Sequence, residues 1–111
     1  MPHLIQKTQL YDIQAQLEAV TGQYFKCFCV DNTETDFLCA WRNETRIGYV
    51  LALHRQSYRT FTVSMGIERG HEIETRYSKS LDQLECQRLL GNPRECVLLF
   101  TGQKTEKGYG I

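Results

Sequence analysis

The sequence predicts an α+β fold in which an N-terminal helix, an antiparallel sheet of four to five strands, a second helix and a final central strand follow one another. The main observation is the stretch 37–65, where apolar and polar residues alternate and aromatic side chains are frequent. Two short polar breaks, 43–45 and 55–57, divide this stretch at spacings typical of hairpins. A segment with helical spacing of apolar residues precedes the strands, and a second helical segment follows them.

The length of the chain limits the number of domains. It has 111 residues, which is the size of one ordinary domain with one core. We expect residues 1–101 to form that domain, and the glycine- and lysine-rich residues 102–111 to be a mobile tail. The sequence contains no run of about 18 apolar residues, the length needed to span a bilayer. Its N-terminus lacks the apolar segment of a secretory signal. We therefore expect a cytoplasmic protein without membrane contact, whose five cysteines are free thiols.

The first helix is predicted over residues 8–20. Apolar residues recur there at steps of three and four, at Leu10, Ile13, Leu17 and Val20. Thr8 is suited to the N-cap, and Gly22 is placed where a left-handed residue would end the helix. Since only one stripe is apolar, this helix must pack on another element.

Four strands are predicted over residues 24–30, 36–42, 46–54 and 58–65. Alternation places the larger apolar residues on one face, which we assign to the core beneath the first helix: Phe25, Phe37, Trp41, Tyr49, Leu51, Phe61 and Val63. The opposite face would carry a second apolar patch: Tyr24, Phe28, Val30, Leu38, Ala40, Val50, Ala52 and Tyr58. Patches beyond a few hundred Å² are rarely left in water. Either the second helix or another chain should cover this patch.

The C-terminal third begins with a polar stretch, which could hold a short edge strand over residues 71–77. Ser80, with Gln83 three residues later, resembles a capping box, so the second helix is predicted over residues 80–90. The turn-forming residues 91–93 would stop it. The apolar run 96–100 is short and continuous, which is typical of a central strand buried on both faces.

The charge distribution suggests where a partner would bind. The formal net charge is zero, yet residues 37–66 hold four arginines against the single acid Glu44. Arginine and aromatic residues together on a sheet are typical of protein interfaces and of surfaces that stack on single-stranded nucleic acid. We expect a non-enzymatic protein-binding module that acts as an adaptor, a chaperone-like protein or an inhibitor of a larger assembly. Its predicted binding residues are Arg42, Arg46, Arg55, Tyr58 and Arg59, with Phe28, Leu38 and Val50 as an apolar centre.

Two alternatives accompany this expectation. The partner could be a second copy of the chain instead of another protein. The same arginines, with stacking by Tyr58, could instead bind RNA or single-stranded DNA. A zero net charge argues against binding to nucleic acid by bulk electrostatics alone.

Catalytic and metal sites are less favoured by the sequence. It contains no nucleophile elbow, phosphate loop or H-E-x-x-H motif. His71, Glu72 and Glu74 form the most acid/base-like cluster, but charges along an edge strand are usually only solvated. We expect neither a catalytic residue nor a cofactor.

Three cysteines in the first two strands, Cys27, Cys29 and Cys39, could bind zinc together with His54 or His71. The flanking aromatic residues Phe25 and Phe37 favour instead thiols that fill small volumes in the core. On this interpretation no metal is expected.

Overall fold

The computed structural model describes residues 5–30, 36–45 and 47–103, and it confirms the α+β class. Eight elements follow one another: α1 (Lys7–Thr21), β1 (Lys26–Val30), β2 (Asp36–Arg42), β3 (Ile47–Arg55), β4 (Thr60–Arg69), β5 (Glu72–Asp82), α2 (Gln83–Leu90) and α3 (Pro93–Phe100). Most of the tail that was predicted to be mobile, residues 104–111, lies outside the described residues.

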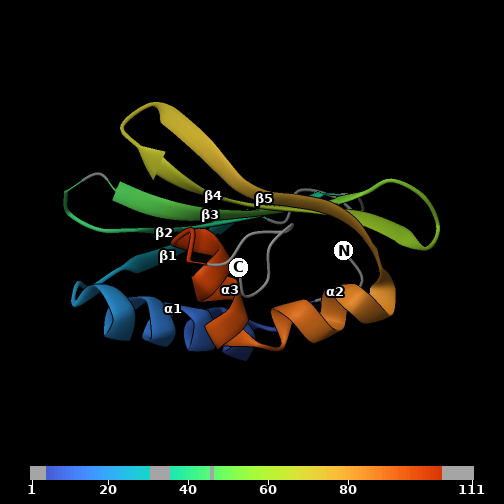
Figure 1. The fold of residues 1–111 in the computed structure, drawn as a ribbon, viewed down its shortest axis with the longest axis horizontal. Helices are drawn as coiled ribbons and strands as arrows, with labels where there is room; N and C mark the ends of the chain where they lie inside the picture. Colours follow the sequence, from blue (N-terminus) through green and yellow to red (C-terminus); the bar gives the residue numbers. More distant parts are fainter. Residues whose placement is uncertain (1–4, 31–35, 46, 104–111) are drawn as a thin grey trace.

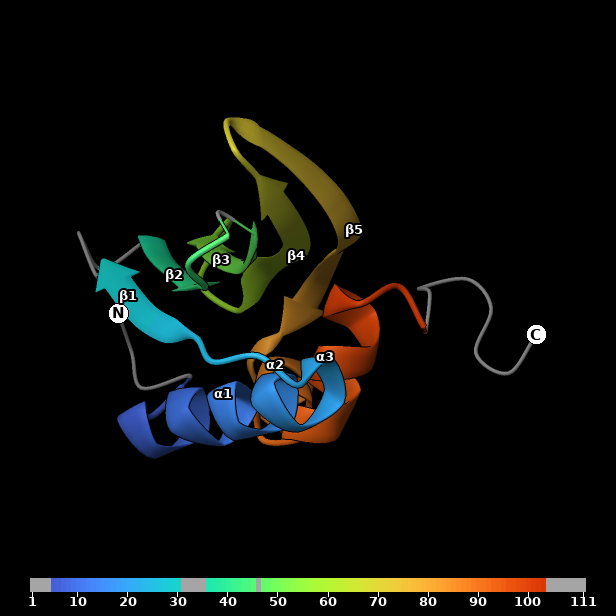
Figure 2. The same cartoon turned by 90° about the vertical axis from the view of Figure 1, so that its left-hand side faces the viewer.

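The five strands form one antiparallel meander in the order β1-β2-β3-β4-β5. Helices α1, α2 and α3, those of the described residues, lie on the same side of this sheet (Figure 1). The hairpin of β4 and β5 extends away from the helices at its turn (Figure 2). The predicted short edge strand was wrong in length, because β4 continues through Gly66 to Arg69 and β5 pairs with it along residues 72–82.

The predicted core face is confirmed. The seven residues that alternation assigned to it are all buried: Phe25, Phe37, Trp41, Tyr49, Leu51, Phe61 and Val63. Helix α1 packs on this face through Leu10, Ile13 and Leu17. The Trp41 indole Nε1 donates to the carbonyl oxygen of Leu10 at 3.3 Å, which ties α1 to the sheet.

The ends of α1 show one correction and one confirmation. The helix begins at Lys7 with Gln6 as N-cap, so Thr8 lies inside the first turn instead of capping it. The backbone N–H of Gln6 donates to the Gln9 side-chain oxygen at 2.6 Å, which satisfies a donor at this end. Gly22 ends the helix with a φ of 71°, the left-handed conformation that glycine adopts without strain.

The predicted final strand was wrong, because residues 96–100 belong to helix α3. Asn92 caps this helix by accepting from the backbone N–H of Glu95 at 3.2 Å, and Pro93 occupies its first turn. The residues that stop α2 therefore also start α3. Residues 96–100 of α3 lie inside the core, where only Leu98 is partly exposed. A helix surrounded by the core is apolar on nearly every side, which explains the continuous apolar sequence.

The second helix begins later than predicted, at Gln83, because β5 runs through Ser80 to Asp82. Asp82 is its N-cap and accepts from the backbone N–H of Glu85 at 2.8 Å, while Glu85 accepts from that of Asp82 at 3.2 Å. Ser80 instead donates to the Gln56 side chain.

Replacing Asp82 with alanine is expected to lower the free energy of unfolding by about 1 kcal/mol, because it removes the cap of α2. Ser80→Ala, at the cap position that the sequence predicted, should change it by less than about 0.5 kcal/mol. Urea unfolding followed by circular dichroism measures both values. Equal losses in the two variants would contradict the helix start seen in the structure.

Candidate functional site

The sheet face opposite the helices, here called the open face, is the candidate site. The register brings Phe28, Ala40 and Val50 into one row across β1, β2 and β3, and Leu38 and Ala52 into the next row. Phe28 is 50% exposed and Leu38 is 44% exposed, whereas the small Ala40 between them is buried. These five residues form an apolar centre on β1–β3.

The open face changes character on the remaining strands. The row of Leu38 and Ala52 continues with Ser64 on β4 and Ser78 on β5, and the row beyond it, which contains His54, continues with Thr62 and Ser80. The apolar centre is therefore bordered by a polar surface on one side. The second helix does not cover the centre, because α2 packs on the same side of the sheet as α1 (Figure 1). The side chain of Val30, which was predicted to belong to this patch, lies outside the described part of the chain.

Arg42 forms the charged end of the apolar centre. Its guanidinium lies 5.8 Å from the ring centroid of Phe28, and it donates to Glu68 Oε2 on β4 at 3.1 and 3.3 Å. This ion pair spans β3, where the residue between the two partners is Gly48. A Cβ atom at Gly48 would lie 3.0 Å from Arg42 Cγ, so the glycine makes room for the arginine to cross the strand.

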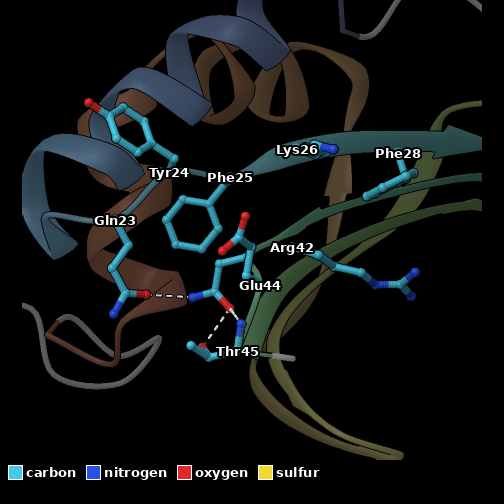
Figure 3. A pocket seen from close by; sticks show the side chains of 9 residues that line it. Gln23, Tyr24, Phe25, Lys26, Phe28, Arg42, Glu44 and Thr45 are labelled. Carbon is cyan, nitrogen blue, oxygen red and sulfur yellow. Dashed lines mark hydrogen bonds between the residues drawn. The ribbon is translucent and has the colours of Figure 1, made fainter.

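A pocket of about 630 Å³ adjoins this end of the open face (Figure 3). Its walls combine aromatic rings, two cations and the β2–β3 turn: Gln23, Tyr24, Phe25, Lys26, Phe28, Arg42, Asn43, Glu44 and Thr45. Asn43 holds the turn by accepting from the backbone N–H of Thr45 at 2.9 Å and from its hydroxyl at 2.7 Å. Asn43 also donates to the Gln23 side chain, which connects the turn to the segment before β1.

Sequence reasoning did not assign Gln23 or Asn43 to a site, and it placed Tyr24 in the second apolar patch but not among the binding residues. The available signals were an aromatic residue at the start of a predicted strand and an Asn-led turn, but each is common in the absence of a pocket. Their proximity depends on the pairing of β1 with β2, which places Lys26 opposite Arg42.

The structure brings only some of the predicted binding residues together. Arg42, Phe28, Leu38 and Val50 share the open face. Arg55 lies at the other end of β3, seven residues or about 23 Å along the strand from Gly48, the residue paired with Arg42. Its guanidinium lies 5.1 Å from the ring centroid of the buried Phe61, on the helix side of the sheet.

The remaining predicted residues lie outside this group. Tyr58 and Arg59 are exposed in the β3–β4 turn beyond Arg55, at the far end of the sheet from Arg42. Arg46 lies outside the described residues. The described arginines thus do not form one basic cluster.

The acid/base cluster is spread along the distal β4–β5 hairpin. His71 lies in its turn, and Glu72 and Glu74 are exposed on β5. Glu74 accepts from Arg76 Nη2 at 3.3 Å, a contact between an exposed carboxylate and a partly buried arginine on one strand. This arrangement is that of a charged edge strand.

The three cysteines of β1 and β2 do come together, on the helix side of the sheet. Their Sγ atoms lie 3.5 Å apart for Cys27 and Cys29, 3.3 Å for Cys27 and Cys39, and 2.9 Å for Cys29 and Cys39. His54 lies on the opposite face and His71 lies in the β4–β5 turn, so neither joins them among the described residues. Burial raises the pKa of the Cys27 thiol to about 11 and raises that of Cys39 further.

The fold and the site together define a small α+β domain with an antiparallel meander, helices on one face and an open, partly apolar second face. Comparisons of the chain with models of protein families, with curated proteins and with solved structures found no match. No helix among the described residues has the length and apolar character needed to cross a membrane.

Proposed function

We propose that the chain is a non-enzymatic protein-binding module, an adaptor, chaperone-like protein or inhibitor, that binds its partner through the open face. The observation that carries this proposal is the placement of all three helices on the other face, which leaves Phe28 and Leu38 about half exposed. Contiguous apolar surfaces rimmed by polar groups mark interaction sites. The apolar centre has that character, with Arg42 and Lys26 at one end and hydroxyl groups along one side.

The chemistry of the site suggests what the partner surface should contain. Aromatic residues and arginine are enriched at protein interfaces, and Phe28 and Arg42 supply both at one place. Arg42 is already paired with Glu68, so the less constrained cation is the exposed Lys26 beside the pocket. A partner that fits is a protein surface that is apolar at its centre and acidic where it meets Lys26. The partner is another protein or a second copy of this chain.

Site-specific photo-crosslinking tests this proposal. A photoreactive amino acid is placed at Leu38 on the open face or, as the matched control, at Leu84 on α2, which is 57% exposed. The two variants are irradiated in cells of the source organism, and adducts are identified by mass spectrometry. We expect a discrete protein adduct from position 38 and none from position 84. No adduct from position 38, or the same adducts from both positions, would contradict the proposal.

A charge at the apolar centre should then disrupt the complex. With the captured partner, or with the dimer if the adduct is a second copy, Leu38→Asp is expected to weaken binding at least about tenfold, or about 1.4 kcal/mol. Leu84→Asp should leave the affinity unchanged. Because both side chains are exposed, we expect both variants to keep their fold. Circular dichroism checks this expectation. Equal affinities for the two variants would place the partner elsewhere on the molecule.

The nucleic-acid alternative receives less support from the geometry, because Tyr58 and Arg59 lie far from Arg42 and cannot form one stacking surface with it. It remains an outcome of the same experiments. Crosslinks from position 38 to RNA, with retention on a nucleic-acid column that falls steeply as salt is added, would replace the protein-binding proposal.

A further inference from the structure

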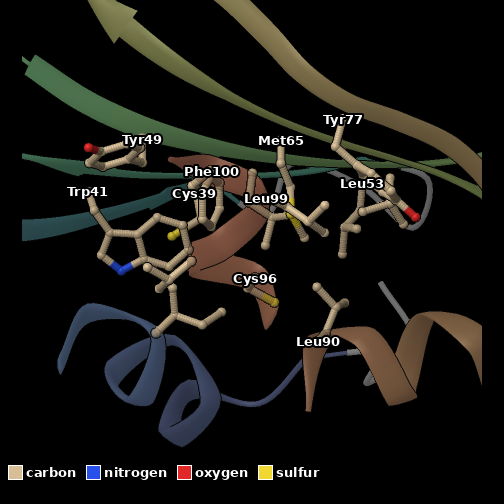
Figure 4. Packing of buried hydrophobic residues seen from close by; sticks show 14 of the residues in the cluster. Cys39, Trp41, Tyr49, Leu53, Met65, Tyr77, Leu90, Cys96, Leu99 and Phe100 are labelled. Atoms are coloured by element: carbon tan, nitrogen blue, oxygen red, sulfur yellow. The ribbon is translucent and has the colours of Figure 1, made fainter. Parts of the chain in front are cut away.

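The cysteines Cys27, Cys29 and Cys39, here called the thiol triad, are brought together by strand geometry. Cys27 and Cys29 are two residues apart on β1, so their side chains point to the same face. Cys39 lies directly opposite Cys29 in the β1–β2 register. Figure 4 shows Cys39 directed into the core cluster beneath the sheet. All three Sγ–Sγ distances fall between 2.9 and 3.5 Å.

Packing of the core accounts for only part of this arrangement. Cys39 is completely buried, as a thiol that fills core volume should be, but Cys27 is half-buried and Cys29 is exposed. The exposed thiol fills no interior space. Its sulfur nevertheless lies against the other two, so the three sulfurs face one another at the edge strand and leave one side of the triad open to solvent.

Three convergent thiols with one open side are a donor set for a soft metal ion. Thiolate ligands select Zn²⁺ and Cu⁺. For a Zn–S distance of about 2.3 Å, an ion in contact with all three sulfurs would stand about 1.3 Å off their plane. That position leaves room for a fourth, exchangeable ligand. We propose that the thiol triad binds one thiophilic d¹⁰ ion, Zn²⁺ or Cu⁺, through three thiolates.

Because the thiols must lose their protons to bind a metal ion, binding to the triad would depend on pH. Burial and the mutual proximity of the thiols disfavour thiolates here while no cation is present. A bound metal ion is a large local positive charge, and it deprotonates a coordinating thiol outright. Binding would therefore release protons from the triad. The site is on the helix side of the sheet and does not depend on the function proposed for the open face.

Metal titration of the reduced, metal-free chain tests this inference. Cd²⁺ serves as the spectroscopic substitute for Zn²⁺, and Cu⁺ is added separately without oxygen. We expect sulfur-to-metal charge-transfer absorption that saturates at one ion per chain. X-ray absorption should then show three sulfur ligands. With Zn²⁺ this measurement should also show a fourth ligand, a nitrogen or oxygen atom, whereas with Cu⁺ it should show three sulfurs alone. Competition with a chelator then shows which of the two ions binds more tightly.

Two alanine variants each remove one of the five thiols. Cys29→Ala removes an exposed member of the triad, and Cys86→Ala removes a buried thiol on α2. Loss of even an outer-shell partner typically costs 10- to 100-fold in metal affinity, so Cys29→Ala should weaken binding by at least about 100-fold. Cys86→Ala should bind as the wild type does, and its thermal midpoint should rise with the ion as in the wild type. Equal weakening in both variants, or no saturable binding by the wild type, would overturn the proposal.

Discussion

Replacing Trp41 with alanine is expected to lower the free energy of unfolding by about 3–5 kcal/mol. Trp41 is completely buried, and its ring meets that of Phe100 edge to face with 5.5 Å between the centroids. Its Nε1 also donates to the Leu10 carbonyl oxygen. One side chain on β2 therefore holds both α1 and α3 against the sheet, and its removal leaves a cavity where the three elements meet.

Urea unfolding followed by far-ultraviolet circular dichroism is the appropriate measurement, because Trp41 is the single tryptophan and its variants lose that fluorescence signal. Trp41→Phe should have an intermediate effect, since it keeps an aromatic ring but removes the hydrogen bond from the indole to the Leu10 carbonyl oxygen. Tyr58→Ala is the control, because Tyr58 is 82% exposed and should change stability by less than about 0.5 kcal/mol. A loss below about 1 kcal/mol in Trp41→Ala would contradict this packing.

Gly66→Ala is expected to lower the free energy of unfolding by about 1–3 kcal/mol, although it adds only one methyl group. A Cβ atom at Gly66 would lie 2.5 Å from the backbone carbonyl oxygen of Glu74 on β5. The pairing of β4 with β5 shifts register between Met65 and Gly66, and this irregularity brings the two backbones close together. Backbone cannot rotate away as a side chain can, so the hairpin itself must shift.

The matched control for Gly66→Ala is Ser64→Ala, two residues earlier on the same strand. Ser64 lies in a regular part of the pairing, and among the described residues its hydroxyl hydrogen-bonds with the Ser78 hydroxyl at an exposed position. We expect a change within about 0.5 kcal/mol for this variant by urea unfolding. If Gly66→Ala is as stable as Ser64→Ala, then the close approach of β4 and β5 is not present in solution.

The candidate site was predictable in its apolar part but not in its charged part. Phe28, Leu38 and Val50 were assigned to one face from alternation alone, and the structure places them there. Arginines were grouped by their nearness to strand ends in the sequence. Arg42 ends β2 and Arg55 ends β3, but these two strands are antiparallel. The two arginines therefore lie near opposite ends of the nine-residue β3. The face that a side chain occupies follows from the local extended backbone. Which strand ends lie side by side depends instead on the topology of the sheet.

For β1 to β3 and the first part of β4, the sequence by itself determined the face that each strand residue occupies, because side chains alternate along any extended backbone with a period of two. It also determined the first helix and its glycine cap at Gly22. Only the tertiary structure decided that residues 96–100 are helical, since a run that is apolar on nearly every side carries no periodicity and its conformation depends on what surrounds it. The same holds for the open face and the thiol triad. Both depend on which elements pack against which face, and that choice is made by contacts between residues far apart in the chain.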